Sequence, residues 1–173
     1  SSGSSGKAFY WPQLRGSQRN GTDRLRSFLE LSFGIRNQRT MAIVGLSMGS
    51  WIGGEHFSWV LKNVAVSSSY PFSVLSPGNQ HDEIISMIHS LGATADQILL
   101  VVCPSAIGHL RLLAEEQKRP LPLAKLRFLV VGEPFPESLR TDLSAHAKLA
   151  MGMSPILSVF GSADTGTLGI ESS

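Results

Sequence analysis

Two long apolar runs, with a helical segment between them, most strongly constrain how this chain can fold. Residues 97–103 read QILLVVC, and residues 126–131 read LRFLVV. Continuous apolar runs of this length are typical of strands that are buried on both faces of a parallel sheet. Parallel neighbours need a crossover connection, and the segment between the two runs has the pattern of a helix at 106–117. The two runs therefore predict a βαβ unit.

The same alternation extends toward both ends of the chain. We expect strands at 40–45, 70–75, 97–103, 126–131 and 156–160, and helices at 23–34, 54–63, 82–91, 106–117 and 136–150. Strands that alternate with helices predict right-handed crossovers and an α/β fold, with a doubly wound, mostly parallel sheet and helices on both faces. Because no repeat or linker divides the chain, we expect a single domain over residues 1–173.

Composition excludes several classes of function. Hydrophobic residues make up 42% of the 173 residues and charged residues 16%, which indicates a globular protein. The formal charge of +2 includes no dense basic tract, so we expect no nucleic acid polymer as a partner. One cysteine excludes an internal disulfide and fits a reducing compartment. No apolar run is long enough to span a bilayer and no signal peptide is recognised, so we expect a cytoplasmic protein without a membrane partner.

Small or charged residues come directly after three of the expected strands. These segments are Gly45-Leu46-Ser47-Met48-Gly49, Gly132-Glu133-Pro134, and the loop of residues 161–166. The carboxyl ends of parallel strands meet at one edge of a sheet, so the three segments are expected to line one crevice. In the last segment, Asp164 can accept a hydrogen bond or bind a hard metal ion, although it could equally cap the next element of the chain.

The first six residues, SSGSSG, allow two interpretations. They could be a flexible expression linker. They could also be a native phosphate-binding loop, because their backbone N–H groups and hydroxyls suit phosphate oxygens and Lys7 supplies a cation directly after them. The spacing does not match the nucleotide-binding P-loop.

The segment at 45–49 also matches the G-x-S-x-G nucleophile elbow of α/β-hydrolases. A serine hydrolase using Ser47 would need an acid and then a histidine, and Asp142 and His146 have that order. Both, however, fall within one expected helix. The alternative is a glycine-rich turn at which strand and helix pack closely, or a turn that lines a ligand site.

Taken together, four features resemble the adenylate-forming acid ligases of the acyl-CoA synthetase superfamily, in particular the phenylacetate–CoA ligase-like branch. The start of the chain, 1–7, looks like the family's Ser/Thr/Gly-rich phosphate signature, with Ala8 where proline is usual. Gly132-Glu133-Pro134, followed by Glu137 and Arg140, is similar to the branch's G-A-E-P segment, which contacts the adenine and ribose side of ATP. Phe160-Gly161-Ser162-Ala163-Asp164 looks like the aromatic-Gly-x-Ser/Thr-Glu motif, with aspartate for glutamate. The region 45–54 falls where the family's acid- and nucleotide-binding wall begins.

The resemblance implies ATP-dependent activation of a carboxylic acid, with an aromatic acid favoured, to an acyl-adenylate and then to a thioester with coenzyme A. It implies two catalytic residues, Lys7 on the phosphates and Asp164 on Mg²⁺. It also implies that the nucleotide is contacted by Ser1, Ser2, Gly3, Ser4, Ser5, Gly6, Gly132, Glu133, Pro134, Phe160, Gly161, Ser162, Ala163 and Thr165. The family's small C-terminal domain with its adenylating lysine is not matched. We therefore expect a central fragment that does not turn over alone, and a homodimer is left open. A non-catalytic nucleotide-binding domain is the remaining alternative.

Overall fold

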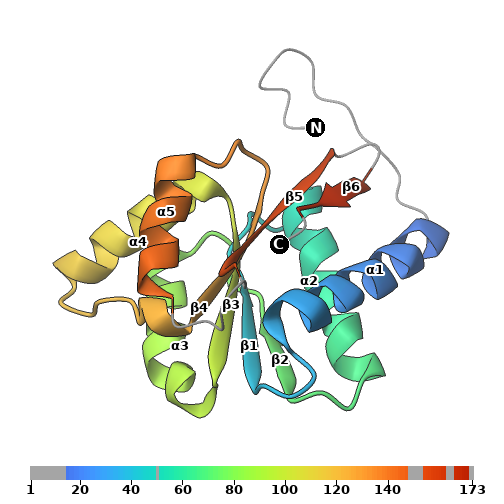
Figure 1. Ribbon diagram of the computed structural model, residues 1–173, viewed down its shortest axis with the longest axis horizontal. Helices are drawn as coiled ribbons and strands as arrows, with labels where there is room; N and C mark the ends of the chain where they lie inside the picture. Colours follow the sequence, from blue (N-terminus) through green and yellow to red (C-terminus); the bar gives the residue numbers. More distant parts are fainter. Residues whose placement is uncertain (1–14, 50, 148–153, 163–165, 172–173) are drawn as a thin grey trace.

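One six-stranded sheet runs through the computed structural model, which describes residues 15–49, 51–147, 154–162 and 166–171 (Figure 1). The strand order is β2-β1-β3-β4-β5-β6. The first five strands in this order are parallel to their neighbours, and β6 is antiparallel to β5. Their bounds are β1 Thr40–Val44, β2 Phe72–Leu75, β3 Gln97–Val102, β4 Leu126–Val131, β5 Ile156–Ser162 and β6 Gly166–Ile170. The predicted α/β fold with a mostly parallel sheet is confirmed.

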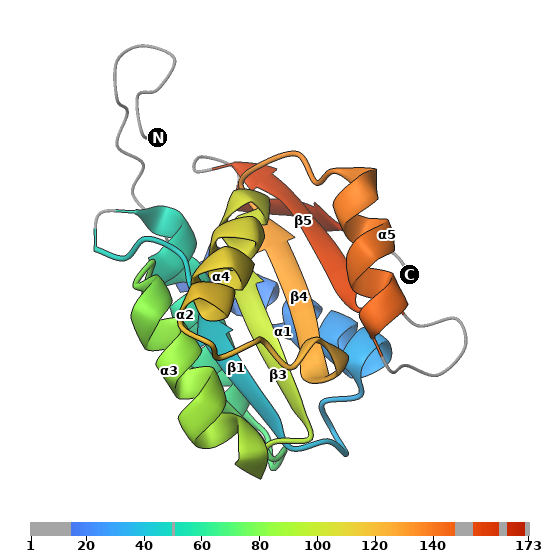
Figure 2. The ribbon, with the colours of Figure 1, turned by 90° about the vertical axis from the view of Figure 1, so that its left-hand side faces the viewer.

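Five α-helices cover the two faces of this sheet (Figures 1 and 2). Helices α1 (Arg15–Phe33) and α2 (Ile52–Ser67) lie on one face. Helices α3 (His81–Leu91), α4 (Pro104–Glu116) and α5 (Glu137–His146) lie on the other. Short 3₁₀ turns at Gly92–Thr94 and Leu123–Lys125 precede β3 and β4. Among the described residues, no helix is both long and apolar enough to cross a membrane.

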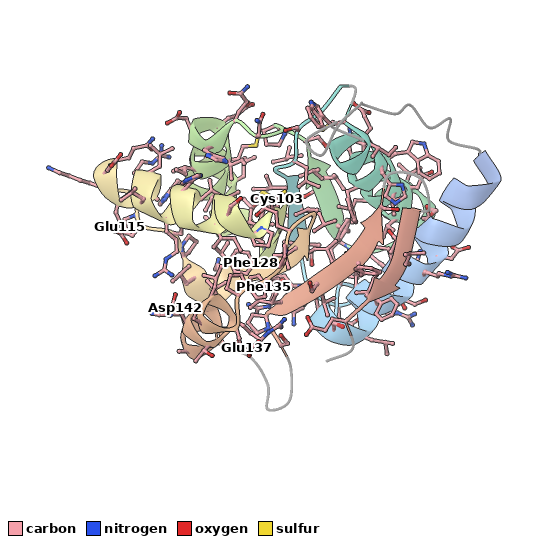
Figure 3. All side chains as sticks on the ribbon, turned by 90° about the horizontal axis from the view of Figure 1, so that it is seen from above. Cys103, Glu115, Phe128, Phe135, Glu137 and Asp142 are labelled. Carbon is pink, nitrogen blue, oxygen red and sulfur yellow. The ribbon has the colours of Figure 1, made fainter. Side chains whose placement is uncertain are left out.

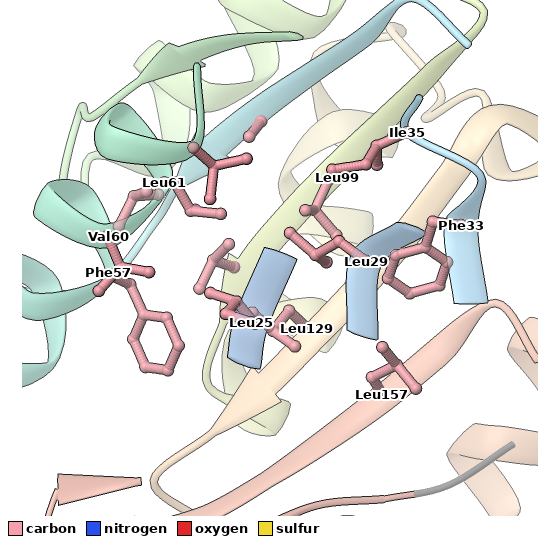
Figure 4. Close-up of a cluster of buried hydrophobic side chains, with 14 of the residues drawn as sticks. Leu25, Leu29, Phe33, Ile35, Phe57, Val60, Leu61, Leu99, Leu129 and Leu157 are labelled. Carbon is pink, nitrogen blue, oxygen red and sulfur yellow. The ribbon is translucent and has the colours of Figure 1, made fainter. Parts of the chain in front are cut away.

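The strands contribute alternate side chains to two separate hydrophobic cores. Leu99 and Val101 of β3 pack with Leu29 of α1 and Leu61 of α2, in the cluster drawn in Figure 4. Their neighbours along the strand, such as Leu100, pack instead under α3, α4 and α5. All six residues of β3 are buried, which explains why its sequence is a continuous apolar run.

The direction of chain progress changes between β1 and β3. From β1 the chain moves outward to β2, and it then crosses back to place β3 on the other side of β1. In open α/β sheets such a switch point, at the carboxyl ends of the strands, is the usual place for a ligand crevice. The segments after β1, β3, β4 and β5 are therefore the candidate elements of a ligand site.

The predictions of individual elements were wrong in four places. Helix α2 runs from Ile52 to Ser67 and is longer at both ends than the expected 54–63. Helix α1 begins at Arg15, well before the expected start at residue 23, although it ends as expected before Gly34, which has a φ of +60°. Helix α5 ends at His146, earlier than residue 150. The expected loop at 161–166 is part of a β-hairpin, because β5 continues to Ser162 and β6 begins at Gly166.

Candidate functional site

The three predicted segments come after strands that are parallel, so they lie at one edge of the sheet. Strands β4 and β5 are neighbours, whereas β3 lies between β1 and β4. The segment after β4 and the end of β5 are therefore adjacent, and the segment after β1 is farther along the edge. Residues 1–7, including Lys7, lie outside the described residues, as do Ala163, Asp164 and Thr165. The predicted phosphate loop and metal ligand therefore remain predictions.

A shallow pocket of about 450 Å³ lies between α5 and the β5–β6 hairpin. Its lining comes from three parts of the chain: Phe135 and Arg140, then Ser158 and Phe160, then Gly169, Ile170 and Glu171. Phe135 comes directly after Gly132-Glu133-Pro134, and Phe160 directly precedes Gly161. Figure 3 shows Phe135 and Glu137 next to β5, where α5 begins. The pocket is thus lined by Phe160, which the sequence predicted to contact the nucleotide, and by Phe135, which directly follows another predicted segment.

The charged groups at this pocket pair with one another: one guanidinium binds two carboxylates, which leaves a net charge of −1. Arg140 donates from Nε to Glu137 at 3.1 Å and from Nη2 to Glu171 at 2.9 Å. Its guanidinium also lies over the Phe135 ring, 5.0 Å from the ring centroid. On the other side, the Phe160 side chain is 72% exposed. With one cation between two carboxylates, the pocket suits a flat neutral ring better than a phosphate group.

Glu133 makes a contact that the sequence did not indicate. Its carboxylate accepts hydrogen bonds from the Ser105 backbone N at 3.0 Å and from the Ser105 hydroxyl at 2.9 Å. Ser105 is in the first turn of α4, so Glu133 satisfies an N–H group at the positive end of that helix. An acid directly after a strand is as often a cap of the following helix as a ligand contact, but here Glu133 caps the preceding helix α4. Its predicted contact with adenosine stays a prediction.

The same arrangement makes Cys103 a poor nucleophile. Burial raises the pKa of the Cys103 thiol, and the negative charge of Glu133 raises this pKa further. A cysteine at a helix N-terminus commonly has a lowered pKa, and here the carboxylate acts in the opposite direction. Gly132 has a φ of +89°, a backbone conformation that favours glycine, and this lets the chain turn close to the thiol.

The segment around Ser47 is a packing turn. A Cβ added to Gly54 would lie 2.2 Å from the carbonyl oxygen of Ser47, so the turn packs directly on the first turn of α2. Glu55 accepts a hydrogen bond from the backbone N of Gly49 at 3.1 Å and holds the turn there. Helix α2 begins only at Ile52, whereas the nucleophile elbow is a sharp, strained strand-to-helix turn. The backbone of Ser47 also shows no such strain, because Ser47 is not among the described residues with positive φ.

The partners that a hydrolase would need do not lie near Ser47. Asp142 forms an ion pair with Arg111 of α4, and His146 Nδ1 contacts the backbone oxygen of Asp142 at 2.8 Å. Both residues are on α5, which starts after the carboxyl end of β4 and runs back toward the opposite edge of the sheet (Figure 2). The structure therefore does not assemble Ser47, Asp142 and His146 into a triad.

Five residues of the pocket were not predicted from the sequence, namely Phe135, Ser158, Gly169, Ile170 and Glu171. Phe135 and Ser158 carried weak signals, because Phe135 adjoins a predicted motif and Ser158 is a polar residue inside an apolar run. Glu171 carried none, since its role depends on the return of β6 along β5. Among the described residues, no group of three histidine, cysteine or acidic side chains is placed to hold a metal ion.

Comparisons with known proteins support the fold. No family model matches the chain, and no curated protein matches its sequence. Among solved structures, it is similar to a 2-hydroxyisobutyryl-CoA ligase, solved in an open conformation in complex with 2-HIB-AMP and CoA. The TM-score is 0.59 at 14% sequence identity, over 86% of this chain and 30% of that one. The chain thus spans about 30% of the length of this ligase and shares the fold of that part.

Proposed function

We propose that this chain is the central part of an adenylate-forming acid–thiol ligase. The parent protein activates a carboxylic acid with ATP to an acyl-adenylate and pyrophosphate, and it then transfers the acyl group to coenzyme A. The observation that carries this proposal is the pocket, because it brings Phe160 of one motif segment together with Phe135, which directly follows the other. The fold shared with a CoA ligase supports it.

The residues have distinct roles in this proposal. The adenine ring stacks on Phe160 beside Phe135, and the backbone of the hairpin from Gly161 onward positions the ribose. Ser1–Gly6 and Lys7 hold the phosphates. The positive charge of Lys7 and the N–H donors of the preceding loop offset the negative charge that develops on the leaving pyrophosphate.

Asp164 is the proposed ligand of Mg²⁺. It is a carboxylate two residues after the described end of β5, and carboxylate oxygen is the ligand type that this ion prefers in proteins. When bound, Mg²⁺ acts as a Lewis acid on phosphoryl oxygens. Aspartate is one methylene shorter than the glutamate usual in the family, and it keeps the negative charge. The resemblance to the phenylacetate branch favours an aromatic acid as the substrate.

Phe160→Ala is expected to weaken binding of AMP to the isolated chain, as measured by isothermal titration calorimetry. Loss of one base–aromatic stack costs about 1–3 kcal/mol, or roughly five- to 150-fold in Kd. Leu168→Ala is the matched control. Leu168 is another exposed apolar side chain of the same hairpin, 57% exposed, but it does not line the pocket. Equal AMP affinity for the Phe160 variant and the wild type would show that this pocket does not bind the nucleotide.

A further inference from the structure

Arg140 is the side chain that joins the separate parts of the pocket. It is on α5, near the helix start, where its Nε is held by Glu137 of the same helix at 3.1 Å. Its guanidinium covers Phe135, which belongs to the segment after β4. Its Nη2 reaches Glu171 at 2.9 Å, at the end of β6 and 31 residues away in sequence. One side chain therefore contacts the loop after β4, the helix that comes after this loop, and the hairpin.

Glu171 connects Arg140 to β5 through hydrogen bonds to Ser158. Its backbone N donates to the Ser158 oxygen at 2.9 Å, and its carboxylate accepts from the Ser158 backbone N at 3.3 Å. Ser158 is two residues before Phe160 on the same strand, on the same side of the sheet. The position of the Arg140 guanidinium is therefore linked, through Glu171, to the strand that carries Phe160.

The chemistry of this link requires arginine. The flat face of a guanidinium can stack on an aromatic ring. At the same time, the N–H groups along the edge of the guanidinium can donate to two carboxylates. Lysine offers a point charge without that shape. The Arg140 side chain is only 21% exposed, so its ion pairs are screened less by solvent than those of a fully exposed residue.

From this geometry we infer that Arg140 is a positioning residue for the nucleotide. It holds Phe135 under its guanidinium and, through Glu171, the strand that carries Phe160, without itself offering a free charge to the ligand. The inference rests on the proposed function for its ligand, whereas the link between loop and hairpin is a property of the fold alone.

Arg140→Met tests the inference, with Arg111→Met as its control. Arg111 also ties α5 to the rest of the protein, through Asp142, but it does not line the pocket. We expect Arg140→Met to raise the Kd for AMP about fivefold or more, the size typical of coupling within one network of contacts. We also expect faster amide hydrogen exchange at 132–136 and 158–162. Arg111→Met is expected to leave the AMP Kd unchanged.

Glu171→Gln and the double variant separate positioning from simple stability. If Arg140 acts through Glu171, Arg140→Met should weaken AMP binding less in the Glu171→Gln background than in the wild type. A lower melting temperature with an unchanged AMP Kd would show that Arg140 only stabilises the fold, and would overturn the inference. If the wild type binds no AMP, the proposed function fails for this chain. In that case, hydrogen exchange alone tests the link between the loop after β4 and the hairpin. Unchanged exchange in Arg140→Met would refute this link.

Discussion

Replacing Gly54 by alanine is expected to destabilise the fold by about 3 kcal/mol, at the upper end of what overpacking costs. The new Cβ would lie 2.2 Å from the Ser47 carbonyl oxygen and 2.8 Å from the Met48 sulfur. The methionine side chain can move, but the Ser47 oxygen is backbone, and the turn is also held by Glu55. Relief would require α2 to separate from the turn after β1.

Gly53→Ala is the matched control for this prediction. Gly53 is the preceding residue of the same helix turn, and the nearest atom to an added Cβ there is 3.9 Å away. Alanine is favoured over glycine in helices by up to about 1 kcal/mol, so this variant should be as stable as the wild type or more stable. Urea unfolding measured by circular dichroism determines the stability of both. Equal stability of the two variants would contradict the close packing of turn and helix.

Arg127→Met is expected to keep or raise the free energy of unfolding, by as much as about 1–4 kcal/mol. The Arg127 residue is only 6% exposed, and burial lowers the pKa of its guanidinium. Its Nη1 donates to the backbone oxygens of Leu126 at 2.7 Å and Ala124 at 3.3 Å. Within the described part of the chain, no carboxylate pairs with it and its Nε has no hydrogen-bond partner. An apolar side chain of similar length removes this uncompensated charge and keeps the packing.

Arg39→Met makes the same substitution where the charge is paired. Arg39 is exposed and binds Asp96 through Nη2 at 2.7 Å and through Nε at 3.2 Å. Hydrogen bonds from Arg39 lower the pKa of Asp96 to about 2, so the pair is fully charged at neutral pH. This variant should therefore lower the free energy of unfolding at pH 7. A larger loss of stability in Arg127→Met than in Arg39→Met would show that the buried guanidinium has a stabilising partner.

The fold was predictable where local pattern and burial agree. Strands β3 and β4 are buried over almost their whole length, so their sequences are mainly apolar, with Arg127 as the charged exception in β4. Helices α3 and α4 have clear apolar faces. Strand β6 was missed because Gly166–Ile170 contains two glycines and only two apolar residues, and it is held by pairing with β5. The early part of α1 was missed because its polar, glycine-containing sequence has low helix propensity.

The candidate site was predictable only in outline. Parallel strands fix which loops share an edge, and this places the segment after β4 beside the end of β5. Which partner each side chain meets depends on contacts between distant parts of the chain. Glu133 meets Ser105, 28 residues earlier, and Arg140 meets Glu171, 31 residues later. No local pattern encodes either pair.

The most direct test of the proposed function is acid-dependent exchange of labelled pyrophosphate into ATP. The assay uses the full polypeptide that contains this chain, with Mg²⁺ and a panel of aromatic and aliphatic carboxylic acids, beside the isolated chain. We predict exchange by the full polypeptide with at least one acid, and none by the isolated chain, since the family's adenylating lysine belongs to a further domain. Binding of AMP without exchange for any acid would indicate a non-catalytic nucleotide-binding domain and would contradict the ligase proposal.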